Sequence, residues 1–400
     1  MSVIRTSLLA SAIAVFAAAC TTVPPAPPAK PPVAPVPPEK PAEAPKELFR
    51  AATFAAIPGW GRDNLREAWP AFVTSCEVLV RKPDWKEPCQ VAAGVDGASE
   101  TAVRTFFESF FIPYQVFNQD GSDTGLVTGY YEPLLRGARK RGGAFQIPLH
   151  RAPDDLLTID LSSVYPELKN MRLRGRVVGN KVVPYPTRGE MMQSNALTGK
   201  EIVWVDDAVE AFFLQVQGSG RVHLADTKET IRIAYADQNG HPYRSIGRYL
   251  VDKGEMTLDQ ASAQAIKAWF ASNPARQQEL LSANPSYVFF REEKLADPKK
   301  GPKGALGVPL TPQRSIAVDP QYIPLGVPVF LATTQPGKET PLQRLMMAQD
   351  TGGAIRNPVR ADFFWGFGGD AGEKAGKMKQ RGQMWVLLPK LGSPPVLTSR

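Results

Sequence analysis

The stretch that decides the fold runs from Asp350 to Asp362 and reads Asp-Thr-Gly-Gly-Ala-Ile-Arg-Asn-Pro-Val-Arg-Ala-Asp. Its two end carboxylates lie on either side of a Gly-Gly turn, and Phe363-Phe364-Trp365-Gly366 follows directly. An acid that can donate a proton, beside flat aromatic faces, suits a site that cleaves sugars. Aspartate next to glycine or proline is also ordinary turn chemistry, so spacing alone leaves both interpretations open.

The amino-acid sequence of this stretch resembles the three-aspartate (3D) module of the membrane-bound lytic murein transglycosylase A (MltA) family. The first of the three acids is Asp319, in Ile316-Ala317-Val318-Asp319-Pro320. Further blocks that resemble the family, in its order, are Gly129-Tyr130-Tyr131-Glu132-Pro133, Phe213-Leu214-Gln215-Val216-Gln217-Gly218-Ser219-Gly220, Tyr235-Ala236-Asp237-Gln238-Asn239-Gly240 and Asn284-Pro285-Ser286-Tyr287-Val288-Phe289-Phe290. Together these blocks cover residues 125–390. One departure is a loop between Ile355 and Asp362 that is a residue longer than is usual, with Pro358 inside it.

The resemblance implies a mainly β fold with helices. A double-psi β-barrel (3D) domain would be built from residues 49–144 and 286–400. A second β-rich domain, residues 145–285, would be inserted into it, and the substrate groove would lie between the two. The pattern itself agrees, because the short alternating strands and tight turns that follow residue 286 favour a small closed barrel.

Apolar spacing predicts helices over residues 59–118 and 246–281, and strand character over 126–150 and 220–235. Asp206 is the expected N-cap of a helix that presents Phe212 on its apolar face and ends at Gly218. Thr257 is expected to cap a further helix.

Cleavage of a glycosidic bond usually takes two carboxylates. The resemblance implies a lyase that breaks the MurNAc-β-1,4-GlcNAc bond of peptidoglycan and leaves 1,6-anhydroMurNAc ends, with the C6 hydroxyl of the same ring as nucleophile. Because that attack is intramolecular, one acid can serve as both donor and acceptor. Asp362, beside aromatic residues that would raise its pKa, is the expected acid. Asp350 is the second catalytic candidate and would orient Asp362 or shape its loop, whereas Asp319 is expected to be structural.

The candidate substrate-binding residues come from three blocks. Tyrosines could line the groove or pack beneath a strand, and the glutamine and serine side chains could bind sugar hydroxyls or act as helix caps. The candidates are Tyr130, Tyr131, Glu132, Gln215, Gln217, Ser219, Gly352, Gly353, Phe363 and Trp365.

The first twenty residues are typical of a secretion signal, with a short apolar core too short to span a membrane. Ala17-Ala18-Ala19-Cys20 resembles a lipoprotein box, although cleavage near Ala19 with an incidental Cys20 is the alternative. Residues 21–48 hold 11 prolines in 28 positions, which favours an extended linker without a core. These features predict a lipid anchor at Cys20 that holds the protein on the periplasmic face of the outer membrane of a Gram-negative bacterium.

Composition limits the partners. The net charge is +8 and the pI about 9.3, which suits a polyanion. For an exported chain we expect peptidoglycan glycan strands, and an assembly with other cell-wall synthesis or hydrolysis enzymes, rather than nucleic acid. Cys76 and Cys89 are the expected disulfide, with two free thiols as the alternative. No cofactor is expected, and no metal, because no Cys or His cluster has ligand spacing.

Two rival functions use the same residues. A muramidase would deliver water and leave a reducing end, and a non-catalytic, expansin-like wall protein would use Asp362 only as a glycan contact. The sequence by itself does not separate a lyase from a hydrolase. The resemblance carried by the five blocks favours the lytic enzyme, above all over the non-catalytic protein.

Overall fold

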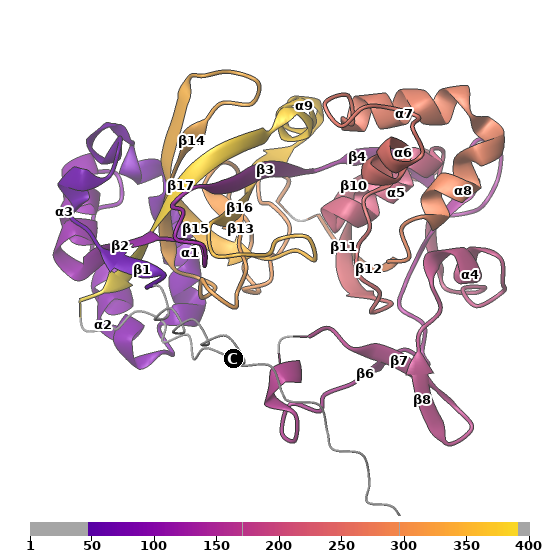
Figure 1. Ribbon diagram of the computed structural model, residues 1–400, viewed down its shortest axis with the longest axis horizontal. Coiled ribbons are helices and arrows are strands. Elements are labelled where there is room, and N and C mark those ends of the chain that lie inside the picture. The colour runs from indigo at the N-terminus through magenta and orange to yellow at the C-terminus, as the bar shows by residue number, and fades with distance from the viewer. Residues whose placement is uncertain (1–46, 170, 296, 391–400) are drawn as a thin grey trace, which may run out of the picture. The chain divides into compact units, whose positions relative to one another are not determined.

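The computed structural model describes residues 47–169, 171–295 and 297–390 (Figure 1). The expected signal segment, Cys20 and nearly all of the Pro-rich linker lie outside these residues. Within them no helix is long and apolar enough to cross a membrane.

The α-helices are α1 (Trp69–Leu79), α2 (Pro83–Ala92), α3 (Glu100–Phe110), α4 (Arg188–Met192), α5 (Ala208–Gln217), α6 (Ile246–Asp252), α7 (Ala263–Ser272), α8 (Gln277–Ser282) and α9 (Gly369–Lys377). The strands are β1 (Phe49–Ala51), β2 (Phe111–Val116), β3 (Gly125–Glu132), β4 (Leu134–Ala138), β5 (Ile147–His150), β6 (Leu157–Thr158), β7 (Arg174–Val178), β8 (Lys181–Pro184), β9 (Glu201–Val205), β10 (Ser219–Leu224), β11 (Thr230–Gln238), β12 (Val288–Glu293), β13 (Ser315–Ala317), β14 (Pro328–Thr334), β15 (Pro341–Asp350), β16 (Arg360–Phe367) and β17 (Lys379–Pro389).

Six strands close into a barrel. The sheet order β17-β14-β15-β13-β16-β3 returns to its start because β3 also pairs with β17. The β13–β15 and β16–β3 pairs are parallel and the remaining pairs are antiparallel. Strands β2 and β1 extend this sheet from β17. The closed barrel has the architecture that the short alternating strands predicted, since closure removes the exposed edges of a sheet.

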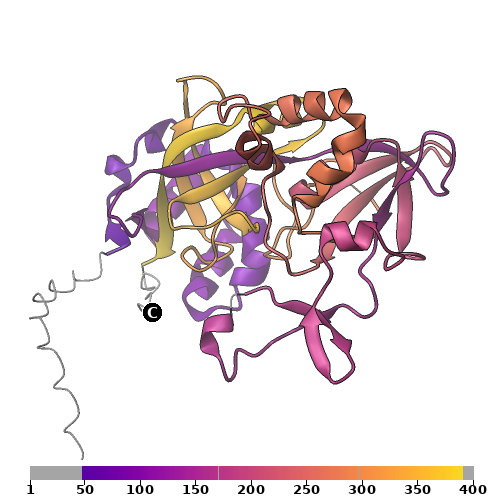
Figure 2. The ribbon, with the colours of Figure 1, turned by 45° about the vertical axis from the view of Figure 1, so that its right-hand side comes forward.

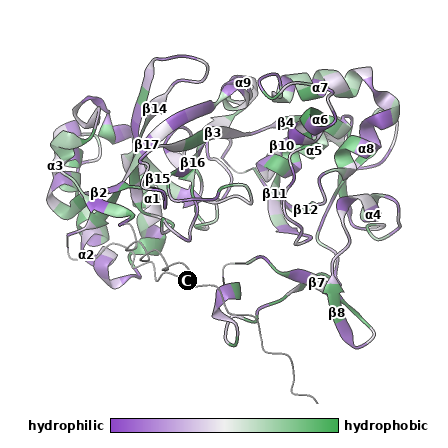
Figure 3. Ribbon diagram, in the orientation of Figure 1, coloured by the Kyte–Doolittle hydropathy of each residue, from purple (hydrophilic) through white to green (hydrophobic). Residues whose placement is uncertain are grey.

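A second, six-stranded sheet has the order β12-β11-β10-β4-β9-β5. Its core is apolar and includes Leu214 of α5 together with Val222 of β10, and Figure 3 shows hydrophobic residues along both elements. Helices α6, α7 and α8 pack with Phe212 of α5 in a neighbouring cluster. Strands β6, β7 and β8 form a separate three-stranded sheet (Figure 2).

The two larger sheets divide the chain differently from the expected boundaries at residues 144 and 286. Strand β4 follows β3 after the single residue Pro133, yet it pairs with β9 and β10 of the six-stranded sheet. Strand β12 likewise pairs with β11. Hydrogen-bond partners, and not strand character, decide which sheet a segment joins, so β4 and β12 belong to the six-stranded sheet, and the domain boundaries stay a prediction.

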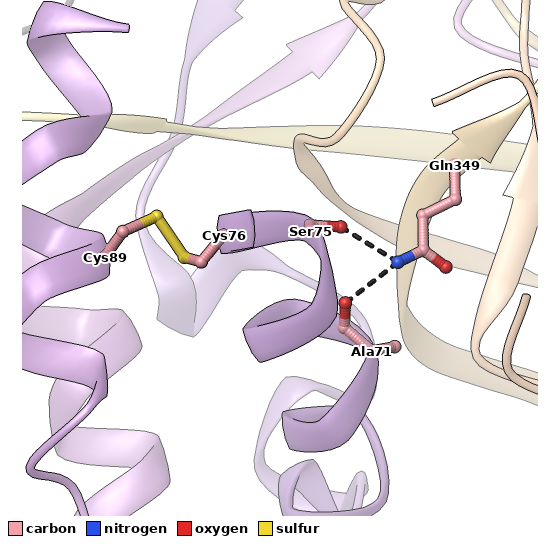
Figure 4. Close-up of a disulfide and its surroundings, with 5 residues drawn as sticks. All are labelled: Ala71, Ser75, Cys76, Cys89 and Gln349. Atoms are coloured by element: carbon pink, nitrogen blue, oxygen red, sulfur yellow. Dashed lines mark hydrogen bonds between the residues drawn. A yellow bond between two sulfur atoms is a disulfide. The ribbon is translucent and has the colours of Figure 1, made fainter. Parts of the chain in front are cut away.

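Helices α1, α2 and α3 pack beside the barrel, and a disulfide joins the first two. Cys76 of α1 and Cys89 of α2 are bonded, with their Cα atoms 5.4 Å apart. Next to the disulfide on α1, the amide of Gln349 donates hydrogen bonds of 2.9 Å to the Ala71 carbonyl and to Ser75 Oγ (Figure 4). Gln349 is completely buried and directly precedes Asp350, so α1 holds the end of strand β15.

Several local predictions need correction. The helical pattern expected to reach residue 118 ends at Phe110, and Phe111 begins β2, which pairs with β17. The N-cap of α5 is Asp207, whose carboxylate accepts from Val209 N and Glu210 N; Asp206 instead lies 3.6 Å from Arg136. Ser262, and not Thr257, caps the helix that follows. Gly218 ends α5 in the left-handed conformation as predicted, with φ +84°.

Candidate active site

Barrel pairing brings the two acids of the Asp350–Asp362 stretch to one level. Ala317 of β13 pairs with Asp350 of β15 on one side and with Asp362 of β16 on the other. Two strand spacings separate the acids, which corresponds to about 10 Å between their backbones. The turn between β15 and β16 therefore returns the chain past β13 and places both carboxylates at the same end of it.

Asp362 is partly exposed and is held by a short polar chain. Its Oδ1 accepts a 2.6 Å hydrogen bond from Thr128 Oγ1, and Arg360 Nη2 donates to the same hydroxyl at 2.9 Å. Desolvation raises the pKa of Asp362, and the Arg360 charge and the Thr128 hydrogen bond oppose that rise. A carboxyl with a raised pKa can carry a proton to a reacting oxygen.

Asp350 is bound more fully than Asp362. Its Oδ2 accepts from the Tyr130 hydroxyl at 3.0 Å, and its Oδ1 accepts from Ala305 N at 2.9 Å. Burial raises the pKa of Asp350, and the negative charge of Asp362 raises it further. Burial and both aspartates raise the pKa of Tyr130 well above 10, so its hydroxyl stays protonated and acts as donor.

Asp319 shapes the loop that leads to Asp362. Its side chain is buried and accepts from Gln321 N at 3.1 Å and from Asn357 N at 3.0 Å. Asn357 has φ +97°, an uncommon conformation for a residue other than glycine. Asp319 thus holds the backbone of the turn around Pro358.

Comparison with known proteins places the chain in a family. Residues 126–291 match the family description "MltA specific insert domain", and residues 314–388 match "3D domain". The membrane-bound lytic murein transglycosylase A of Escherichia coli K12 is 33% identical over 293 residues, which cover 71% of each protein. This chain belongs to the MltA family.

Solved structures agree with that assignment. A lytic transglycosylase of Burkholderia pseudomallei is 49% identical, with a TM-score of 0.58 over 86% of this chain and 96% of that one. E. coli MltA with bound chitohexaose is 26% identical, with a TM-score of 0.65 over 87% of this chain and 95% of that one.

In this MltA family member, side-chain alternation separates the residues around Asp362 into two sets. Phe363 and Trp365 lie on the opposite face of β16, buried in the barrel core with ring centroids 4.6 Å apart. The apolar residue on the Asp362 side is Phe364, which packs against Tyr130 at 5.1 Å. Because neighbouring residues of a strand point to opposite faces, Phe363 and Trp365 are packed in the core, and Phe364 is the aromatic residue beside Asp362.

Glu132, another candidate substrate-binding residue, is paired with arginines inside the protein. Its side chain is fully buried and accepts from Arg221 Nε at 2.8 Å and from Arg232 Nε at 2.6 Å. Both arginines are nearly buried, and Arg232 also donates to the carbonyl of Lys300. Glu132 therefore joins the end of β3 to strands β10 and β11 and has no free oxygen for a sugar.

The glutamines of α5 bind protein groups in the same way. Gln215 is buried, and its Oε1 accepts from Arg188 Nη2 at 2.7 Å and from Val288 N at 3.2 Å. Gln217 Oε1 accepts from Tyr131 N at 3.0 Å and so ties α5 to β3. Ser219 is buried at the start of β10. Gln215 and Ser219 are buried, whereas Tyr131 and Gln217 remain partly exposed.

The remaining candidates lie in the turn after β15. Gly352 is partly exposed and accepts from Ile355 N at 3.1 Å through its carbonyl, whereas Gly353 is exposed with open space beside its Cα. Both glycines therefore keep the backbone accessible next to Asp350.

Sequence reasoning missed the two residues that hold Asp362. Thr128 precedes the quoted Gly129 block by one residue, and Arg360 lies two residues before the acid. Period-two spacing was the available signal, because Thr128, Tyr130 and Glu132 share one face of β3. Which of these side chains meets which acid depends on the parallel register of β3 with β16, where Thr128 pairs with Asp362.

No group of three or more His, Cys, Asp or Glu side chains in the described part of the chain could hold a metal ion. Metal-independent catalysis stays a prediction.

Proposed function

We propose that the chain is a lytic transglycosylase that cleaves the MurNAc-β-1,4-GlcNAc bond of peptidoglycan and leaves 1,6-anhydroMurNAc ends. Membership of the MltA family supports the activity. The observation that carries the chemistry is the partly exposed Asp362 carboxyl, whose pKa desolvation raises and whose position Thr128 fixes.

In the proposed reaction, protonated Asp362 donates its proton to the bridging oxygen while the bond from that oxygen to C1 of MurNAc breaks. The C6 hydroxyl of the same ring then attacks C1, and the Asp362 carboxylate accepts the hydroxyl proton. The acid is restored, and no water is consumed. The intramolecular nucleophile replaces a second catalytic carboxylate, since a group held in place gains a large effective concentration.

Asp350 has a positioning role in this proposal. Its two oxygens already accept from Tyr130 and Ala305, so fewer lone pairs remain for substrate than on Asp362. The negative charge of Asp350 also raises the pKa of the neighbouring Tyr130 hydroxyl, which keeps that hydroxyl protonated. Tyr130 is buried beneath Asp350, while Tyr131 and Gln217 remain as contacts for sugar.

We further propose that the glycan strand binds between the barrel and the six-stranded sheet. One of the related structures carries bound chitohexaose, which supports an extended sugar site. Glu132 and Gln217 join the two sheets at the change from β3 to β4, and this change at Pro133 marks our proposed domain boundary.

The location of the protein is a proposal of the same kind. Relatives carry the name membrane-bound, which supports a lipid anchor at Cys20 and a place on the periplasmic face of the outer membrane. Cys20→Ser should release the mature protein from membranes and leave its activity on isolated sacculi unchanged. A wild-type protein found in the soluble periplasmic fraction contradicts the anchor.

Mass spectrometry of the products from purified sacculi tests the activity. Anhydro-muropeptides are expected. Hydrated muropeptides would indicate a muramidase, and binding without release would indicate the expansin-like alternative.

A further inference from the structure

A cavity lies in the second sheet region, and the proposed reaction does not use it. Its volume is about 510 Å³, within the range of roughly 300–1,000 Å³ that small-molecule sites occupy. Strands β5 and β9 and helices α4, α5 and α8 contribute to its walls. Apolar lining comes from residues such as Met191, Leu197 and Phe212. The polar lining residues include two with ionised side chains, Arg188 and Glu201, together with His150 and Tyr287.

Arg188 brings a buried charge to this cavity. Its side chain is 3% exposed, and the described residues include no carboxylate in ion-pair contact with it. The guanidinium lies over the rings of Phe212 and Tyr287, 4.8 and 4.9 Å from their centroids. Burial lowers the pKa of Arg188 to about 10, so the side chain is still charged at neutral pH.

Counting donors shows what Arg188 has left. An arginine has five N–H groups. Nε donates to the Asn284 carbonyl, and Nη2 donates to Gln215 Oε1 and the Ser286 carbonyl. All three acceptors are neutral. The two N–H groups of Nη1 have no hydrogen-bond partner among the described residues. Because Nη1 is not among the buried side-chain atoms that lack a partner, these N–H groups are accessible to a bound anion.

Glu201 supplies the opposite charge. It lines the same cavity, pairs with His150 in the β5–β9 register, and forms no ion pair or side-chain hydrogen bond with any residue the structure describes. Burial lowers the pKa of His150 to about 4, so the His150 ring is neutral at pH 7. Its Nδ1 lies 2.8 Å from the Tyr287 hydroxyl. The cavity therefore presents a guanidinium without an ion-pair partner and a carboxylate whose recorded interaction is with the His150 ring, with apolar walls around them.

We propose that this cavity binds the free end of a peptidoglycan peptide stem, with a stem carboxylate on Arg188 Nη1 and a stem ammonium group on Glu201. A singly charged carboxylate group at Arg188 fits better than a phosphate, because Glu201 would repel a doubly charged anion. The apolar walls suit the short aliphatic groups of such a peptide. This assignment deepens the proposed function and rests on it for the identity of the polymer.

Helix α5 connects the cavity to the reaction centre. Ala211, Phe212 and Gln215 line the cavity, and Gln217 at the end of the same helix holds the backbone of Tyr131. Residues 211 to 217 span about 9 Å along the helix axis. A stem in the cavity would hold its glycan strand against the barrel, so binding would favour peptide-bearing glycan over bare glycan.

Calorimetric titration of the full chain with a stem tetrapeptide that contains meso-diaminopimelate tests the proposal. The wild type should bind it and should bind the version with amidated carboxyl groups at least about tenfold more weakly, a loss of about 1.4 kcal/mol. Glu201→Gln and Thr198→Trp, which fills the exposed rim of the cavity, should each raise the Kd by a similar factor. Thr227→Trp, an exposed position outside the cavity, should not.

No binding of the tetrapeptide, or equal binding by the wild type and the two cavity variants, overturns the proposal. Arg188 also holds the loop around Asn284, so Arg188→Lys is informative only with a native melting profile. Release of anhydro products from stem-stripped glycan strands is measured separately. Failure there refutes the proposed reaction, whereas failure of the titration refutes the stem site alone.

Discussion

Thr128 Oγ1 donates a 2.6 Å hydrogen bond to Asp362 Oδ1, across the parallel pair of strands β3 and β16. Since Arg360 donates to the same hydroxyl, the threonine has a defined direction: it accepts from the arginine and donates to the acid. Asp362 is thereby held by one hydrogen bond on one oxygen, which leaves its other oxygen for a ligand.

Asp362→Asn should abolish release of anhydro-muropeptides, because both proton transfers depend on this carboxyl and a general acid–base group contributes on the order of 10²–10⁴-fold. The same change should raise the melting temperature at neutral pH. Desolvation raises the folded-state pKa of Asp362, so the folded protein binds more protons than the unfolded chain between the two pKa values. The ionised Asp362 therefore lowers the free energy of unfolding of the wild type at neutral pH, and this loss disappears as the pH falls. Thermal melts at pH 7 and near pH 3 measure the difference, which should shrink at the lower pH.

Asp350→Asn is the matched control for that variant. Tyr130 and Ala305 each donate to one oxygen of Asp350, and the amide of asparagine has only one oxygen, so one of the two donors loses its acceptor. The variant should therefore lower activity through misplacement of the loop and not by loss of the proton carrier. A dead Asp350→Asn with a native melting profile, beside an active Asp362→Asn, would reverse the roles assigned to the two acids.

Thr128→Val should shift the pH profile. The Thr128 hydrogen bond lowers the pKa of Asp362, so its removal should raise that pKa. The reaction begins from the protonated acid, and activity should therefore be lost on the alkaline side as pH rises through this pKa. In Thr128→Val the alkaline limb of kcat/KM should lie at higher pH, and Thr128→Ser should restore it. An unchanged limb would remove Asp362 from the role of proton donor.

Glu132→Gln should destabilise the fold. The change leaves Arg221 and Arg232 buried without their shared carboxylate, and breaking a buried ion pair costs about 3–5 kcal/mol. Glu373→Gln is the matched control, because Glu373 pairs with Lys377 on the exposed face of α9 and such pairs contribute about 0–1 kcal/mol. Denaturant unfolding gives both values, and equal losses would contradict the interpretation.

The double variant Cys76→Ser/Cys89→Ser should lose about 3 kcal/mol of unfolding free energy, as expected for a loop of 13 residues. Activity at low temperature should persist, because no residue in contact with the two aspartates comes from α2. Dithiothreitol should reproduce the loss in the wild type and have no effect on the variant. A loss of activity without a loss of stability would indicate that α1 acts on Asp350 through Gln349.

Chelation should leave catalysis intact. The proposed reaction uses proton transfer and an internal hydroxyl only, so treatment with EDTA followed by gel filtration should not change the product spectrum. Loss of activity that Mg²⁺ or Ca²⁺ restores would make the aspartates cation ligands and would replace the acid–base role of Asp362.

The sequence by itself determined the family and the strand-rich class and supplied the acids of the proposed site, because motifs and period-two alternation are local properties of the chain. The turn glycine Gly218 and the helical stretch after residue 246 also followed from local chemistry. Predictions from local sequence pattern failed where the pairing of strands decides the structure. The sequences of strands β4 and β12 have no feature that assigns them to the second sheet. Asp362 and Phe363 are neighbours on β16, and the position of the core decides which of the two side chains is buried.

Only the tertiary structure decided what each polar residue does. Glu132 and Tyr130 stand two positions apart on one strand, yet one neutralises two buried arginines and the other supports Asp350. Thr128 and Arg360 became part of the site through the register of β3 against β16. The charges of Arg188 and Glu201 belong to one cavity although they come from different elements, α4 and β9. These relations arise from contacts between distant segments, and a one-residue change of register would exchange the faces of every side chain involved.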